Sequence, residues 1–160
     1  MKKIKIYLDT SVISYLSTDD AYEKTNDTQK LWQEIKTDMY DVVISDLVFE
    51  EIQRCPEPKQ SVLFNYLTEI KYQREEISNE INNIASSIIK LGILSERNRD
   101  DCLHIATAVA TDCDYILSWN FKHMVNVKTI KGVRAIVNLY GYNNIDIIQP
   151  TMLVEKGNEP

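Results

Sequence analysis

Apolar and polar positions along the chain follow two different periods. Residues 4–8 carry an apolar side chain at every second position, which predicts a short strand. Residues 9–11, Asp-Thr-Ser, are types that favour a helix N-terminus, and apolar positions follow them. Further along, apolar residues repeat at helical spacing over 23–39, and a compact apolar run at 41–45 predicts a second strand. The chain therefore opens as strand, helix, helix, strand.

The middle and end of the chain continue this alternation of helices and strands. Asp46 is a candidate N-cap for the helix that follows the second strand, and Ser78 is one for a later helix with a broad apolar face. Residues 71–76 give no clear pattern. The remaining expected elements are helices over 46–54, 58–69, 78–91 and 133–139, and strands over 114–118 and 145–148.

One further predicted helix, over residues 99–111 with Asn98 as its N-cap, is apolar on nearly every side. Such a helix belongs in the interior of the fold. Strands that alternate with helices favour an α/β architecture with a parallel or mostly parallel sheet covered on both faces. With no repeat or linker in the sequence, we expect a single domain over residues 1–160.

Composition narrows the class of protein. Apolar residues make up 44% of the 160 residues, and only four glycines and four prolines interrupt them, which excludes a low-complexity chain. Three cysteines without CxxC spacing indicate reduced, mostly buried thiols. The apolar run at the N-terminus is interrupted at Lys5, and no segment reaches the roughly 20 apolar residues of a membrane span. We expect a cytoplasmic protein with no membrane contact.

The formal charge of −6 argues against a nucleic-acid partner, but its distribution argues for one. Residues 115–144 contain no acidic residue. The basic residues of this stretch are Lys122, Lys128, Lys131 and Arg134. Such a basic strip predicts a surface that can meet phosphates.

Three acidic residues are expected at the carboxyl ends of the parallel strands, where α/β folds place their sites. Asp9 ends the first strand, and Asp101 lies in the first turn of the buried helix. Helical spacing directs Glu51 inward with the apolar residues and Glu50 toward water. Each acid also has an ordinary structural explanation, as a helix cap, a first-turn acid or an amphipathic-helix residue. Their joint convergence is the stronger indication.

Three converging carboxylates repel each other unless positive charge compensates them, and oxygen-only ligands suit Mg²⁺ or Mn²⁺. A divalent ion on carboxylates indicates phosphodiester hydrolysis by an oriented, deprotonated water. His104 and His123 are interpreted as structural or surface residues outside this site. Trp119 and Phe121 have types that stack on nucleobases, but core packing is the preferred interpretation for both.

Four segments cover nearly the whole chain in order: IYLDTSVISYLS, VVISDLVFEEIQR, DCLHIATAVATDCDYILSWNFKHM and GYNNIDIIQPTMLV. Together they resemble the PIN-domain family in its VapC-like toxin branch. The resemblance implies a three-layer α/β/α sandwich with a central, mostly parallel sheet. It also implies an Mg²⁺- or Mn²⁺-dependent endoribonuclease, a cognate antitoxin and a homodimer.

Carried over by motif, the family's acids are Asp9, Glu51 and Asp101, which are also the residues chosen from the pattern. Thr10 and Ser11 follow the first acid as the family prefers and are candidates to hold it or a phosphate. Asn120 stands where many members have a fourth acid. An amide oxygen can ligate a metal but brings no charge, so one-metal and two-metal sites both stay open.

Two other functions compete with this interpretation. Phosphatases of the haloacid-dehalogenase type use an aspartate after the first strand as nucleophile, but they need a second aspartate where this chain has Ser11. A PIN fold that binds RNA or protein without cutting is the alternative that Asn120 favours, whereas retention of the other three acids argues against it. An antitoxin gene beside this one would support a toxin role.

Overall fold

The computed structural model describes residues 2–18 and 20–154, so the ends of the predicted 1–160 domain lie outside the described residues. Its centre is a five-stranded sheet in the order β3-β2-β1-β4-β5. Every neighbouring pair of strands is parallel. The strands are β1 (Ile4–Leu8), β2 (Tyr40–Ser45), β3 (Gln73–Glu75), β4 (Tyr115–Leu117) and β5 (Asp146–Ile148).

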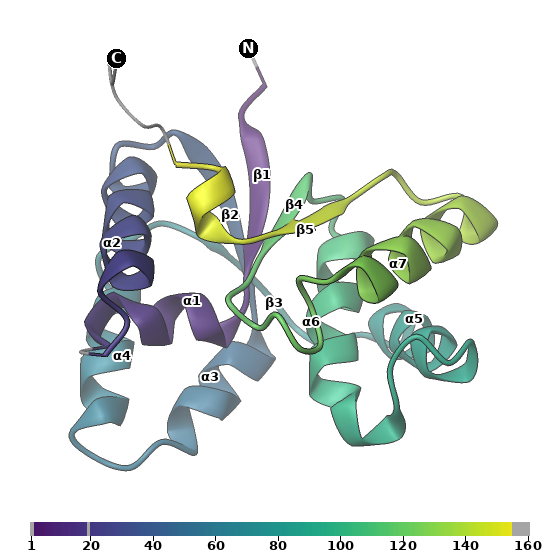
Figure 1. Cartoon of the computed structure of the whole chain (residues 1–160), viewed down its shortest axis with the longest axis horizontal. Helices are drawn as coiled ribbons and strands as arrows, with labels where there is room; N and C mark the ends of the chain where they lie inside the picture. The colour runs from purple at the N-terminus through teal and green to yellow at the C-terminus, as the bar shows by residue number, and fades with distance from the viewer. Residues whose placement is uncertain (1, 19, 155–160) are drawn as a thin grey trace.

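Helices cover both faces of the sheet, so the molecule has three layers (Figure 1). One face carries α1 (Thr10–Ser14), α2 (Tyr22–Lys36), α3 (Asp46–Gln53) and α4 (Lys59–Leu67). The other carries α5 (Asn79–Lys90), α6 (Arg99–Ala110) and α7 (Val127–Tyr140). Short 3₁₀ turns are η1 (Tyr15–Ser17), η2 (Glu96–Asn98) and η3 (Pro150–Met152). The predicted three-layer α/β/α sandwich is confirmed.

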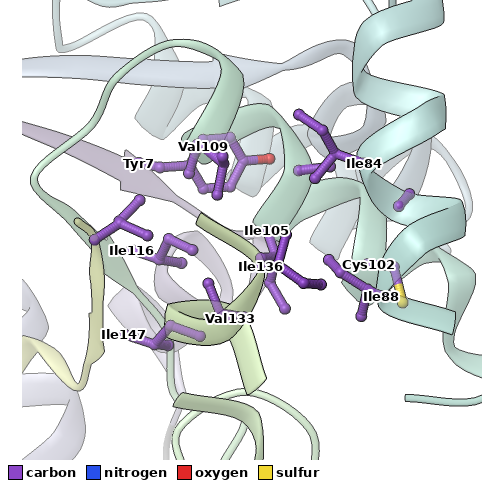
Figure 2. Packing of buried hydrophobic residues seen from close by; sticks show 14 of the residues in the cluster. Tyr7, Ile84, Ile88, Cys102, Ile105, Val109, Ile116, Val133, Ile136 and Ile147 are labelled. Carbon is purple, nitrogen blue, oxygen red and sulfur yellow. The ribbon is translucent and has the colours of Figure 1, made fainter. Parts of the chain in front are cut away.

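Each face of the sheet has its own hydrophobic core because side chains alternate between the faces of a strand. Within β1, Ile6 and Leu8 belong to the core under α1–α4, whereas Tyr7 belongs to the core under α5–α7. Figure 2 shows the second core, where Ile116 and Ile147 of the sheet lie near Ile105, Val133 and Ile136. As the sequence predicted, α6 is buried along most of its length.

The register of the central strands fixes the position of the first acidic residue. Leu8 of β1 pairs with Leu117 of β4, so the next residues, Asp9 and Ser118, also lie side by side. Because all strands are parallel, their carboxyl ends share one edge of the sheet. The residues that follow the strands therefore meet at that edge.

Some local predictions need correction. The unclear stretch 71–76 contains β3, a polar edge strand, and α7 begins at Val127 rather than at 133 because Asn126 caps it through the Thr129 amide. Asn98 makes no cap hydrogen bond, since η2 runs directly into α6 and its side chain accepts from Ser95 instead.

The two predictions about serine and aspartate caps on the other helices had different outcomes. Ser78 caps α5 through the Ile81 amide as predicted. Asp46 does not cap α3: it is the first helical residue and pairs with Arg74 of β3. No helix in the described ranges is long and apolar enough to cross a membrane.

Candidate active site

Asp9 is a buried carboxylate at the end of β1, held by two serines. Ser118 Oγ donates a hydrogen bond of 2.6 Å to Asp9 Oδ2, and Ser11 Oγ donates one of 2.5 Å to Oδ1. The side-chain position is further fixed because the Trp119 amide donates to Ser11 Oγ. Asp9 is only 4% exposed and makes no cap hydrogen bond to α1. A helix-cap role alone therefore does not explain this residue.

Glu51, on α3, is fixed by two donors. Thr10 Oγ1 donates to Glu51 Oε1 at 2.9 Å, and His104 Nε2 donates to the same oxygen at 2.5 Å. The other ring nitrogen of His104 shares a hydrogen bond of 2.5 Å with the Tyr7 hydroxyl, which also bonds to Ser45 Oγ at 2.8 Å. As the helical spacing predicted, Glu51 points into the molecule and Glu50 is exposed.

Asp101, near the start of α6, lies against the second histidine. Its Oδ2 is 3.1 Å from His123 Nδ1. The side-chain nitrogen of Asn98, Nδ2, is also within hydrogen-bonding distance of the His123 ring. His123 therefore links the start of α6 to the turn after β4.

The pKa values show that the three acids share one electrostatic environment. Burial raises the pKa of Asp9 above its ordinary value although His104 and the serine hydroxyls act to lower it. Burial also raises the pKa of Asp101, and the charge of Glu51 adds to that increase. Burial is thus the main reason why the charged forms of Asp9 and Asp101 are disfavoured.

In the pair formed by Glu51 and His104, both pKa values are shifted toward the charged forms. Burial acts to raise the pKa of Glu51, but the hydrogen bond and charge of His104 outweigh it, so the pKa lies below its ordinary value. Burial acts to lower the pKa of His104, but Glu51, Asp9 and Asp101 raise it above its ordinary value. All three predicted acids therefore act on one buried imidazole, which favours its protonated form.

Both histidines, which the sequence interpretation treated as structural or surface residues, contact two of the predicted acids in the structure. A signal was present in the sequence for His104, because it lies three positions after Asp101 and so shares a helix face with it. Its contact with Glu51 bridges 53 positions of sequence and could not be read from spacing. His123 meets Asp101 only through the turn that follows β4.

Asn120 has a structural role in this same turn. Its backbone amide donates to Ser118 Oγ, and its side-chain oxygen accepts from the His123 amide. The amide oxygen that was considered as a metal ligand is thus engaged in holding the turn. Asn120 nevertheless lies next to the serine that binds Asp9.

The basic residues of the predicted strip divide between two environments. Lys122, His123 and Lys128 line a cavity of about 440 Å³ that reaches Asn98. Arg134 instead forms an exposed salt bridge with Asp146, and Lys131 is exposed on α7. The cavity adjoins the acidic site through His123, whereas Arg134 is already paired.

The donor set matches the chemistry of Mg²⁺ or Mn²⁺, since Asp9, Glu51 and Asp101 all offer carboxylate oxygens and two have raised pKa values. Within residues 2–18 and 20–154, however, no three acidic, histidine or cysteine side chains are arranged closely enough to hold an ion. The histidines occupy oxygens of Glu51 and Asp101.

The family model of the PIN domain matches residues 6–122, which include all three acids. The chain belongs to the PIN-domain family. No curated protein matches it in sequence.

Solved structures share the fold at low sequence identity. The VapBC2 complex from Rickettsia felis, bound to a DNA fragment from its promoter, contains a chain with 12% identity and a TM-score of 0.56, covering 91% of this chain and 98% of that one. VapC20 of Mycobacterium tuberculosis, a toxin that cleaves the sarcin-ricin loop, has 14% identity and a TM-score of 0.55, covering 88% and 98%. These values show a common fold with VapC toxins.

Proposed function

We propose that this protein is a metal-dependent endoribonuclease and the toxin of a toxin–antitoxin pair, with Asp9, Glu51 and Asp101 as its catalytic carboxylates. The observation that supports it most directly is the match of the PIN-domain model to residues 6–122, which contain all three acids, and each of these acids raises the pKa of the buried His104. A bound Mg²⁺ or Mn²⁺ would supply the charge that activates a water and stabilises the leaving oxygen. The three carboxylates are the side chains that would hold it.

The other residues of the site orient these acids. Ser11 and Ser118 fix both oxygens of Asp9, so its carboxylate presents a single orientation to the sheet edge. Thr10 and His104 do the same for one oxygen of Glu51. Because His104 and His123 contact oxygens of Glu51 and Asp101, binding of a cation by these carboxylates requires those contacts to be exchanged for the metal.

RNA is the proposed substrate because the cavity beside the acids presents two lysines to phosphates. Lys122 and Lys128 line the same cavity as His123, whose ring contacts Asp101. The lysines could thus bind the RNA backbone while the carboxylates lie next to the scissile phosphate. A cognate antitoxin that covers this edge and a homodimer are the partners proposed with it.

A cleavage assay tests the catalytic proposal. Purified protein is incubated with a pool of single-stranded and structured RNAs in Mg²⁺, Mn²⁺ or EDTA. We expect cleavage that requires the metal and is lost in Asp9→Asn and Asp101→Asn. The matched controls are Asp100→Asn, which alters the neighbouring exposed acid, and Glu50→Gln, which alters the outward one beside Glu51. Both controls should keep full activity.

The alternative function is a PIN fold that binds RNA or protein without cutting it. It would be favoured if the folded wild type cleaved none of the RNAs and its melting temperature did not respond to Mg²⁺ or Mn²⁺. The toxin role has a separate test: induced expression should arrest growth in the wild type but not in Asp101→Asn. Arrest by both forms would contradict a toxin mechanism based on cleavage.

A further inference from the structure

Three aromatic rings and a lysine form a cluster next to the acidic site, here called the aromatic cluster: Tyr15, Trp119, Phe121 and Lys24. Trp119 is its centre, with ring centroids 5.7 Å from Tyr15 and 6.2 Å from Phe121. The Trp119 indole N–H donates to Thr28 Oγ1 at 2.8 Å, which fixes the ring against α2. The cluster therefore has a rigid, buried base.

The outer part of the cluster is open to solvent. Trp119 is 5% exposed, whereas Phe121 is 40% exposed. The Lys24 ammonium lies 5.0 Å from the Phe121 ring centroid and 5.9 Å from that of Trp119. Among the residues that the structure describes, Lys24 takes part in no salt bridge with a carboxylate. An exposed aromatic ring and an ammonium group that is held by cation–π contacts are thus presented together.

The aromatic cluster is tied to the candidate catalytic residues by the chain itself. Ser118, which donates to Asp9, directly precedes Trp119. The Trp119 amide donates to Ser11, whose hydroxyl also bonds Asp9. Phe121 follows two residues later, and its amide bonds back to the Trp119 carbonyl. A ligand that reached the carboxylates could extend onto Phe121.

We propose that Phe121 and Lys24 form a nucleobase subsite that selects single-stranded RNA beside the acidic site, an inference that rests on the proposed ribonuclease function. The Phe121 ring stacks on the face of one base, and the Lys24 ammonium pairs with an adjacent phosphate. Only an unpaired or looped base offers its face in this way, because bases within a duplex are stacked on each other. The occupant is therefore RNA with an accessible base.

Binding to a labelled short oligoribonucleotide in EDTA tests the subsite without cleavage. Fluorescence anisotropy compares the intact oligonucleotide, an abasic version with the same phosphates, and the duplex. We expect Phe121→Ala to weaken binding of the intact single strand roughly 5- to 150-fold. The abasic oligonucleotide and the duplex should bind the variant and the wild type equally, and Phe121→Trp should retain the wild-type affinity.

Lys24→Met and a matched surface variant complete the design. Lys24→Met keeps the apolar stem but should weaken the intact and the abasic oligonucleotides alike, because the lost contact is to a phosphate. Leu139→Ala removes another exposed apolar side chain, 67% exposed on α7, and should leave RNA binding unchanged. Circular dichroism and melting temperature confirm that each variant is folded.

The outcomes separate the subsite from the nuclease activity. Unchanged RNA affinity in Phe121→Ala overturns the subsite, even if the wild type cleaves RNA. An equal loss on intact and abasic oligonucleotides also overturns it, and so does an effect on a protein partner alone. Base-dependent binding lost in Phe121→Ala supports the subsite, even if the wild type cuts no RNA and the ribonuclease proposal fails.

Discussion

Replacing His104 by alanine would remove two hydrogen bonds from one buried position. Glu51 would lose its charged donor, and the Tyr7 hydroxyl would lose a partner. Removing one member of a buried ion pair costs about 3–5 kcal/mol. Glu51 keeps the Thr10 hydroxyl and its side chain is 27% exposed, and Tyr7 keeps Ser45. We therefore expect a loss near the lower limit, about 3 kcal/mol of unfolding free energy.

Urea unfolding of the wild type and His104→Ala at one pH measures this loss directly, provided that the slope m is unchanged. Lys3→Met is the control, because it breaks an exposed salt bridge to Asp38 that involves neither His104 nor Glu51, and it should leave the transition where it is. A His104→Ala effect below about 1 kcal/mol would refute the conclusion that this histidine stabilises Glu51.

The pH dependence provides a second check. Glu51 has a lowered pKa, so its stabilising effect is complete above its ordinary value of 4.5 and is lost as the pH falls through the folded value. His104 has a raised pKa, so its effect is complete below its ordinary value of 6.5 and is lost as the pH rises through the folded value. The difference between wild type and His104→Ala should be widest between pH 4.5 and 6.5. A difference that stayed constant from acid to alkaline pH would contradict the ion pair.

Three further predictions concern the buried acid, metal binding and the core. Burial raises the pKa of Asp9, so the ionised carboxylate destabilises the fold as the pH rises above 3.8. Asp9→Asn should therefore raise the melting temperature at pH 7, although it abolishes activity. A lower melting temperature in this variant would contradict the argument. Mg²⁺ should raise the melting temperature of the wild type but not of Asp9→Asn, as scanning fluorimetry would show, and equal increases would place the ion elsewhere. Ile105→Ala, in the core under α5–α7, should cost about 2–5 kcal/mol in urea unfolding, whereas Val62→Ala at a site 41% exposed should cost much less.

The elements that the sequence predicted well are those whose apolar pattern reflects burial. The alternation in β1 and the apolar character of α6 follow from positions in the middle of the sheet and the interior. By contrast, β3 is a three-residue edge strand with polar side chains, so it carries no apolar signal. The first turns of α7 were missed because Val127 and Lys128 face solvent.

The position of the acids could be predicted from the topology of the sheet, whereas the histidine contacts arise only from tertiary packing. Asp9 follows a strand of a parallel sheet, and a general rule places such residues at the functional edge. Nothing in the spacing shows that His104 reaches Glu51 or that His123 reaches Asp101, because these pairs meet only after packing. Core packing, the interpretation preferred for both aromatic residues, is confirmed for Trp119, which is buried. It is wrong for Phe121, which the turn after β4 leaves 40% exposed.

The central position of β1 determines when the acidic site can exist during protein synthesis. Asp9 is translated early, but the serine that holds its second oxygen lies 109 residues later, in the segment after β4. A ribosome must therefore complete most of the chain before β1 gains its second neighbouring strand. Nascent chains that stop before β4 lack one of the two serine donors that position Asp9, so its carboxylate is held at one oxygen alone until that later segment is made.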